Sequence, residues 1–280
     1  MRWDNRRKSS NVEDRRGSGV AGKSIMGGGL GILIFIIYSL MGGNPGDLIN
    51  EPSILNPGKN NEYIETKEDR EMADFVSVIL ADTEDVWSDI FLEIGYEYRQ
   101  PNLVLFTDRV ESACGIAGSA TGPFYCPGDE KLYIDLSFFH ELRDRFKAPG
   151  DFAMAYVVAH EVGHHVQTQL GVTKQMQEIR QQVSQSEYNQ YSVRFELQAD
   201  YLAGVWANRV KGMGYLEEGD LEEALNAASA IGDDRIQKQA QGYTNPDSFT
   251  HGTSKQRQTW FYKGYTTGNL DNWDTFNNPD

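Results

Sequence analysis

His160-Glu161-Val162-Gly163-His164 is the stretch that decides the fold and the chemistry of this 280-residue chain. Residues four apart on an α-helix lie one turn above each other, so His160 and His164 can bind one metal ion while Glu161 projects beside it. The preceding residues 152–159 are apolar and have good helical propensity. The pattern therefore predicts a buried helix that presents two imidazoles and a carboxylate at the spacing of a zinc hydrolase.

The third metal ligand must come from elsewhere, because catalytic zinc takes three protein ligands and leaves one position for water. The extended metzincin pattern needs glycine and histidine where this chain has Gln167 and Leu170, so that variant is excluded. Downstream, residues 192–206 have helical periodicity and place Glu196 and Asp200 four apart on one face. We predict that Glu196 is the third Zn²⁺ ligand and that Asp200 hydrogen-bonds the far nitrogen of a zinc histidine. The alternative is a salt-bridged helix face.

Several further stretches carry a resemblance to one family. They are Met1–Trp3 with Asn11–Gly17, Cys114–Pro127, Tyr133–Phe139, His160–Gln167, Glu196–Asp200 and Ile231–Arg235. Across essentially its whole length the chain resembles bacterial membrane-anchored neutral zinc metallopeptidases. The resemblance implies a zincin-like domain with glutamate as third ligand, acting on peptide or protein substrates.

The predicted mechanism follows from the ligand set. Zinc lowers the pKa of water to about 7 in such sites, and Glu161 would act as the general base. We expect His251 to stabilise the oxyanion, because its segment resembles the His-then-Arg segment of some integral-membrane zinc proteases. Tyr125 and Tyr201 are weaker candidates, and the alternative role for His251 is to cap the following helix. His165 and His140 receive no catalytic role.

The amino-terminal part predicts a membrane anchor. Residues 25–43 are nineteen residues without a charge, which is enough to span once. Residues 1–24 form a basic tail, so the positive-inside rule places the amino terminus in the cytoplasm and the catalytic domain outside the bacterial inner membrane. A cleavable signal peptide is the alternative. A polar tether at 44–65 would follow the anchor.

The remaining residues predict one α+β domain over 66–266, with a polar tail at 267–280. Helical pattern at 67–80 and 84–94 precedes strand patterns at 103–106 and 131–136, and the part after residue 150 is mainly helical. The net charge of −15 argues against a nucleic-acid partner. Nothing in the pattern indicates an oligomeric state.

Cys114 and Cys126 are the only cysteines. They flank a glycine-rich stretch and suit a disulfide in an oxidising environment, with a zinc site as the competing use. The alternative function for the whole chain is a membrane-tethered zinc-containing binding or scaffold protein without turnover. Glu161 argues against it, because a purely structural zinc site gains nothing from an acid beside the metal.

Overall fold

A computed structural model describes residues 1–17 and 63–277. The predicted anchor at 25–43 and residues 44–62 of the predicted tether lie outside the described residues. None of the helices within the described ranges is both long enough and apolar enough to cross a membrane.

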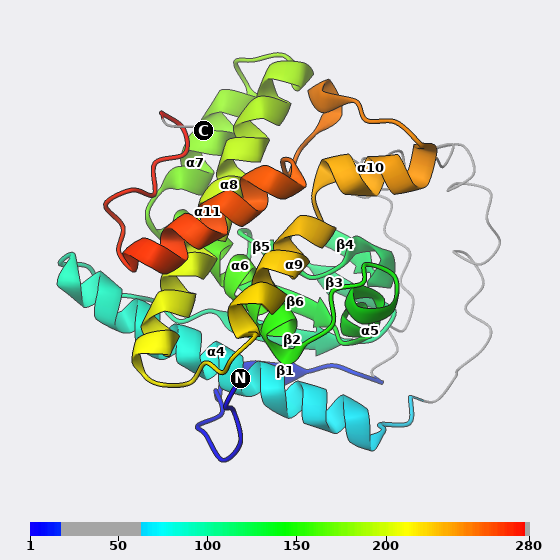
Figure 1. Cartoon of the computed structure of the whole chain (residues 1–280), viewed down its shortest axis with the longest axis vertical. Coiled ribbons are helices and arrows are strands. Elements are labelled where there is room, and N and C mark those ends of the chain that lie inside the picture. Colours follow the sequence, from blue (N-terminus) through cyan, green and yellow to red (C-terminus); the bar gives the residue numbers. More distant parts are fainter. Residues whose placement is uncertain (18–62, 278–280) are drawn as a thin grey trace.

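The predicted α+β class is confirmed (Figure 1). The helices are α4 (Lys67–Glu93), α5 (Ser137–Asp144), α6 (Asp151–Gln169), α7 (Val172–Arg180), α8 (Gln185–Gly212), α9 (Asp220–Ala230), α10 (Asp233–Gln241) and α11 (Ser254–Thr267). The strands are β1 (Val12–Asp14), β2 (Asn102–Phe106), β3 (Arg109–Ser112), β4 (Gly115–Gly118), β5 (Phe124–Cys126) and β6 (Lys131–Asp135). The two helical patterns predicted at 67–80 and 84–94 form one continuous helix, α4.

The larger sheet has the strand order β1-β2-β6-β5. Strands β1, β2 and β6 are parallel, with Leu103 opposite Leu132, and β5 is antiparallel to β6. Strands β3 and β4 form a separate antiparallel hairpin. Strand β5 is therefore an edge strand of the larger sheet, and it lies against α6.

Helix α6 lies at the centre of the domain and packs against α4, α8 and α9 as well as β5 and β6. Its side chains from Phe152 to Gln167 are almost all buried, which explains the long apolar run in the sequence. Helix α11 crosses α8 closely (Figure 1). A Cβ atom at Gly204 would lie 2.1 Å from the Phe261 carbonyl oxygen, so only glycine permits this approach. The close crossing brings side chains of α11 to the buried face of α8.

Residues 1–17 belong to this fold, which corrects, for these residues, the prediction of a basic tail at 1–24 apart from the domain. Strand β1 pairs with β2, with Val12 opposite Leu103. Arg6 forms an ion pair with Asp82 on α4. The correction has a physical reason, because a buried acid on α4 needs a cationic partner and the basic residues of the amino-terminal segment supply it.

The carboxy-terminal segment is also part of the fold, which corrects, for its described residues, the prediction that the domain ends at 266 and is followed by a polar tail at 267–280. Tyr201 on α8 donates a hydrogen bond to the Asn269 carbonyl at 2.9 Å. Thr275 is fully buried and donates to the Arg194 carbonyl at 2.6 Å. The segment Asn269–Phe276 therefore packs along α8, which carries Glu196.

Candidate metal centre and active site

Helices α6 and α8 bring His160, His164 and Glu196 together. His160 Nε2 lies 3.1 Å from one Glu196 carboxylate oxygen, and His164 Nε2 lies 3.5 Å from the other. One ligand atom from each residue lies within 4.8 Å of the others. Zinc bound at about 2.0 to 2.2 Å from each ligand requires donor atoms roughly 3 to 3.5 Å apart. Two imidazole nitrogens and a carboxylate oxygen in this arrangement fit Zn²⁺.

The charges around the ligands also favour a cation. Burial acts to lower the pKa of His160, but the carboxylates of Asp200 and Glu196 raise it to about 9. Burial acts to raise the pKa of Glu196, but the surrounding imidazoles, His164 foremost, hold it well below its ordinary value. Arg257 already pairs with Asp200, so Glu196 is the ionised carboxylate that lacks a permanent cationic partner, and a divalent metal ion would supply that charge.

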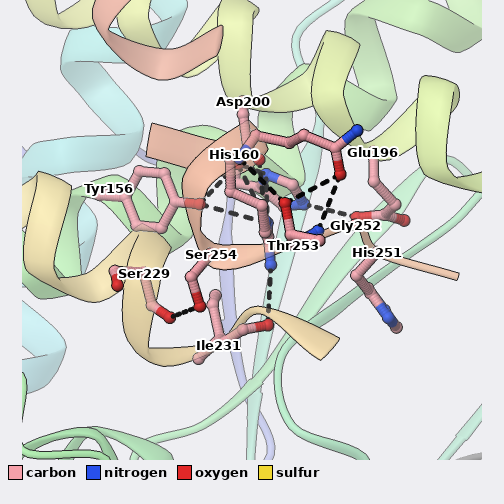
Figure 2. A network of polar contacts seen from close by, with 12 residues as sticks. Tyr156, His160, Glu196, Asp200, Ser229, Ile231, His251, Gly252, Thr253 and Ser254 are labelled. Carbon is pink, nitrogen blue, oxygen red and sulfur yellow. Dashed lines mark hydrogen bonds and ion pairs between the residues drawn. The ribbon is translucent and has the colours of Figure 1, made fainter. Parts of the chain in front are cut away.

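Asp200 lies against the far nitrogen of His160, with its carboxylate oxygen 2.9 Å from His160 Nδ1. Figure 2 shows His160 reached by Asp200 on one side and Glu196 on another. Arg257 on α11 donates to both oxygens of Asp200, from Nε at 2.8 Å and from Nη2 at 3.0 Å. Tyr156 donates to the same carboxylate. Asp200 thus accepts from the Nδ1–H of His160 and leaves Nε2 free to bind a metal.

Glu161 is buried beside the ligands and faces a cavity of about 400 Å³ that His160, His164 and Glu196 also line. Burial raises the pKa of Glu161 above its ordinary value, although the neighbouring His164 and His160 imidazoles act to lower it. A carboxylate with a raised pKa beside a metal site is suited to accept and return a proton.

His251 lines the same cavity from the loop before α11. Its Nδ1 lies 3.3 Å from the buried carboxylate of Asp233. One oxygen of Asp233 also accepts from the backbone N–H groups of Thr250, His251 and Gly252, at 2.7, 2.6 and 3.0 Å. Burial acts to lower the pKa of His251, but Glu196 and Asp233 raise it. Asp233 therefore fixes both the loop and the ring, with Nε2 of His251 left for the cavity.

The other tyrosine and histidine candidates have separate roles. Tyr201 is occupied by the carboxy-terminal segment and does not line the cavity. Tyr125 lines the cavity, and its hydroxyl lies 3.1 Å from His165 Nδ1. Through Tyr125, His165 links α6 to the edge strand β5. His165 also contacts the Arg99 carbonyl. His140 lies 3.8 Å from Glu68 on α4, outside the ligand cluster.

One wall of the cavity is built by the segment between the cysteines. The predicted disulfide between Cys114 and Cys126 is confirmed. Residues 119–125, which lie inside the loop that it closes, line the cavity. The disulfide thus attaches the β3–β4 hairpin to the end of β5, at the rim of the metal site.

Sequence reasoning missed three residues of the site. Asp233 and Arg257 contact it from segments remote in sequence, and Gln167 accepts from His164 Nδ1 at 2.7 Å. Asp233 lies in a stretch that carries the family resemblance, but its role depends on a loop that follows about 17 residues later. Only Gln167 had a local signal, because it lies one helical turn after His164.

The candidate ligand set, the adjacent buried acid and the cavity are the features expected of a zinc metallopeptidase site. A family described as "Putative neutral zinc metallopeptidase" matches residues 1–276. The chain belongs to this family, and membership identifies zinc as its cofactor.

Relatives of the chain carry no functional name. The chain is 48% identical over 288 residues to the uncharacterized protein YpfJ of Escherichia coli strain K12, covering 99% of each chain. It is also 48% identical over 194 residues to an uncharacterized protein of Mycobacterium tuberculosis strain H37Rv, covering 65% of this chain and 64% of the relative. No solved structure matches the chain.

Proposed function

We propose that this protein is a zinc-dependent endopeptidase in which Glu161 is the general base. The observation that carries the proposal is the position of Glu161, which lies beside the three ligand side chains and faces the same cavity. A site that only stabilised the fold would be closed by a fourth protein ligand and would not need this acid.

The chain's own residues account for the proton transfers. Zinc, when bound by His160, His164 and Glu196, supplies Lewis acidity that polarises a peptide carbonyl and activates water. Glu161 accepts the proton of the attacking water and passes it to the amine nitrogen as the bond between carbonyl carbon and nitrogen breaks. As an imidazolium, the form that the Glu196 and Asp233 carboxylates favour, His251 donates a hydrogen bond from Nε2 to the carbonyl oxygen as negative charge develops there, while Asp233 accepts from its Nδ1–H and holds the ring.

The cavity suits a peptide. The edge strand β5 borders it, and its outer edge, which pairs with no other strand of this sheet, can pair with an extended backbone. Phe138, Phe146 and Val157 supply apolar lining to the cavity that Glu161 faces, and a substrate side chain can be buried there. These features support a peptide or protein substrate over a small polar ester or phosphate.

The test is digestion of a peptide library by the purified, zinc-loaded full chain, with products identified by mass spectrometry. We expect internal cleavage that stops on chelation and returns when zinc is added back. A preparation of the Glu161→Gln variant, expressed and purified identically, controls for contaminating peptidases. Stoichiometric zinc without any cleavage would favour the scaffold alternative instead.

A further inference from the structure

A chain of buried amide side chains connects His164 to the carboxy-terminal segment. Gln167 Oε1 lies 2.7 Å from His164 Nδ1. Gln167 Nε2 donates to the Phe195 carbonyl at 2.7 Å and to Gln198 Oε1 at 3.0 Å. Gln198 Nε2 in turn donates to the Trp273 carbonyl at 3.2 Å. Gln167 is fully buried and Gln198 is 2% exposed, so water does not compete for these groups.

The backbone carbonyls of Phe195 and Trp273 fix the direction of every hydrogen bond in this series of amide side chains. A carbonyl oxygen can only accept, so the amide nitrogen of Gln167 must face Phe195, and that of Gln198 must face Trp273. The oxygen of Gln167 is then left for His164. Because that oxygen can only accept, His164 must carry its proton on Nδ1 to complete the hydrogen bond. Its Nε2, which faces Glu196, then holds a free lone pair.

We propose that Gln167 and Gln198 are positioning residues that hold His164 in its metal-binding tautomer and connect it to the segment Asn269–Phe276. The proposal rests on the metal site of the proposed function but does not depend on turnover. The two metal histidines are thus held differently. His160 is oriented by an anion that Arg257 neutralises, whereas His164 is oriented by neutral amides that two backbone carbonyls align.

Zinc affinity of the full chain, measured by competition with a chelator, tests the proposal. The Gln167→Leu variant keeps the volume of the side chain and removes the acceptor of His164. We expect it to bind zinc about 10 to 100 times more weakly, as for other residues that orient metal ligands. The Gln198→Leu variant leaves His164 its acceptor and removes only one of the two acceptors of the Gln167 amide nitrogen, so a smaller loss, about several-fold, is expected. Gln169→Leu, two residues further along α6, is the matched control and should bind zinc like the parent.

The absorption spectrum of the cobalt-substituted protein supplies a readout of ligand geometry. We expect its visible bands to change in Gln167→Leu and to stay unchanged in Gln169→Leu. A folded Gln167→Leu variant with parental zinc affinity and cobalt spectrum would overturn the role of Gln167. If the Gln167→Leu variant does not fold, the Gln198→Leu variant is the test. Parental zinc affinity in Gln198→Leu would then overturn the proposal that Gln167 and Gln198 position His164. A parent that binds no zinc would instead refute the metal site itself, so the two failures are distinguishable.

Discussion

Helix α6 contributes to two clusters of potential metal ligands, and the two clusters differ in how their charges are satisfied. In the middle and second half of the helix are His160 and His164 with Glu196 of α8, and at its amino end Asp151 lies with Asp220 and Glu223 of α9. The first cluster lines a cavity and combines imidazoles with carboxylates, the donor types that zinc prefers. The second contains only carboxylates.

Hydrogen bonds and a cation already satisfy the second cluster. The ammonium group of Met1 lies 2.8 Å from Asp151 and 3.2 Å from Asp220. Glu223 accepts from the Phe152 backbone N–H at 3.0 Å. Asp151 and Asp220 are each the first residue of a helix, where the helix dipole favours a negative charge. Carboxylates that merely lie close together are therefore weak evidence for a metal site. Imidazole and carboxylate donors that line a cavity, with a raised histidine pKa among them, are stronger evidence.

The largest expected effect is the loss of zinc when both metal histidines are removed. His160→Ala combined with His164→Ala deletes two of the three ligands, so bound zinc should fall from about one ion per chain to nearly none. Metal analysis after gel filtration measures this. Undiminished zinc in the double variant would show that the cluster of His160, His164 and Glu196 is not the site.

Glu161→Gln should abolish most turnover while zinc is retained. The amide is nearly isosteric with the carboxylate but cannot accept a proton, so we expect kcat/KM to fall by about 10² to 10⁴. Initial rates on a cleaved library peptide, compared with zinc content in the same preparations, measure both quantities. Retained activity would mean that another group is the base.

Variants of Glu196 and Asp200 should differ in how strongly they lower zinc affinity, because only Glu196 is expected to bind the metal directly. Glu196→Ala removes a ligand and should strip zinc or leave it loosely held. Asp200→Asn keeps the shape of the side chain and removes the charge that orients His160, so zinc affinity should fall by about 10 to 100-fold. Chelator competition ranks the two variants. The reverse order of zinc retention would exchange the roles of these carboxylates.

The smallest effect is expected at the amino end of α6. Asp151→Asn combined with Asp220→Asn removes charges that favour two helix termini, so the free energy of unfolding should fall by about 1 to 2 kcal/mol. Zinc content should stay at the parental value. Urea unfolding and metal analysis on one preparation measure both quantities. A loss of zinc here, with an intact fold, would make the comparison between the clusters invalid.

Sequence periodicity could predict the elements whose signal is local. The burial of α6 and the spacing of His160 and His164 are visible in one helical run, and the strand patterns at 103–106 and 131–136 match β2 and β6. Glu196 and Asp200 could be proposed for the same reason, because their spacing and apolar neighbours lie within one helix.

The contacts made by remote segments could not be predicted. Arg257 reaches Asp200 where Gly204 of α8 and Gly264 of α11 allow the two helices to cross closely, and neither glycine signals a contact in the sequence. Strand β1 has three residues, too few for a recognisable pattern, and its partner lies about 90 residues away. The basic side chains near it predict a tail by composition, although several pair with acids of α4 in the folded chain.

Strand β1 has a consequence for how the protein reaches its final location. The four-stranded sheet is complete only when residues 1–17 and residues 63–277 meet in one compartment. We therefore propose that the amino terminus and the metal site lie on the same side of any membrane, in place of the predicted arrangement with a cytoplasmic amino terminus and an exported catalytic domain. Export, if it takes place, must therefore include the amino-terminal strand, and reporters fused to the two ends of the chain should report the same compartment.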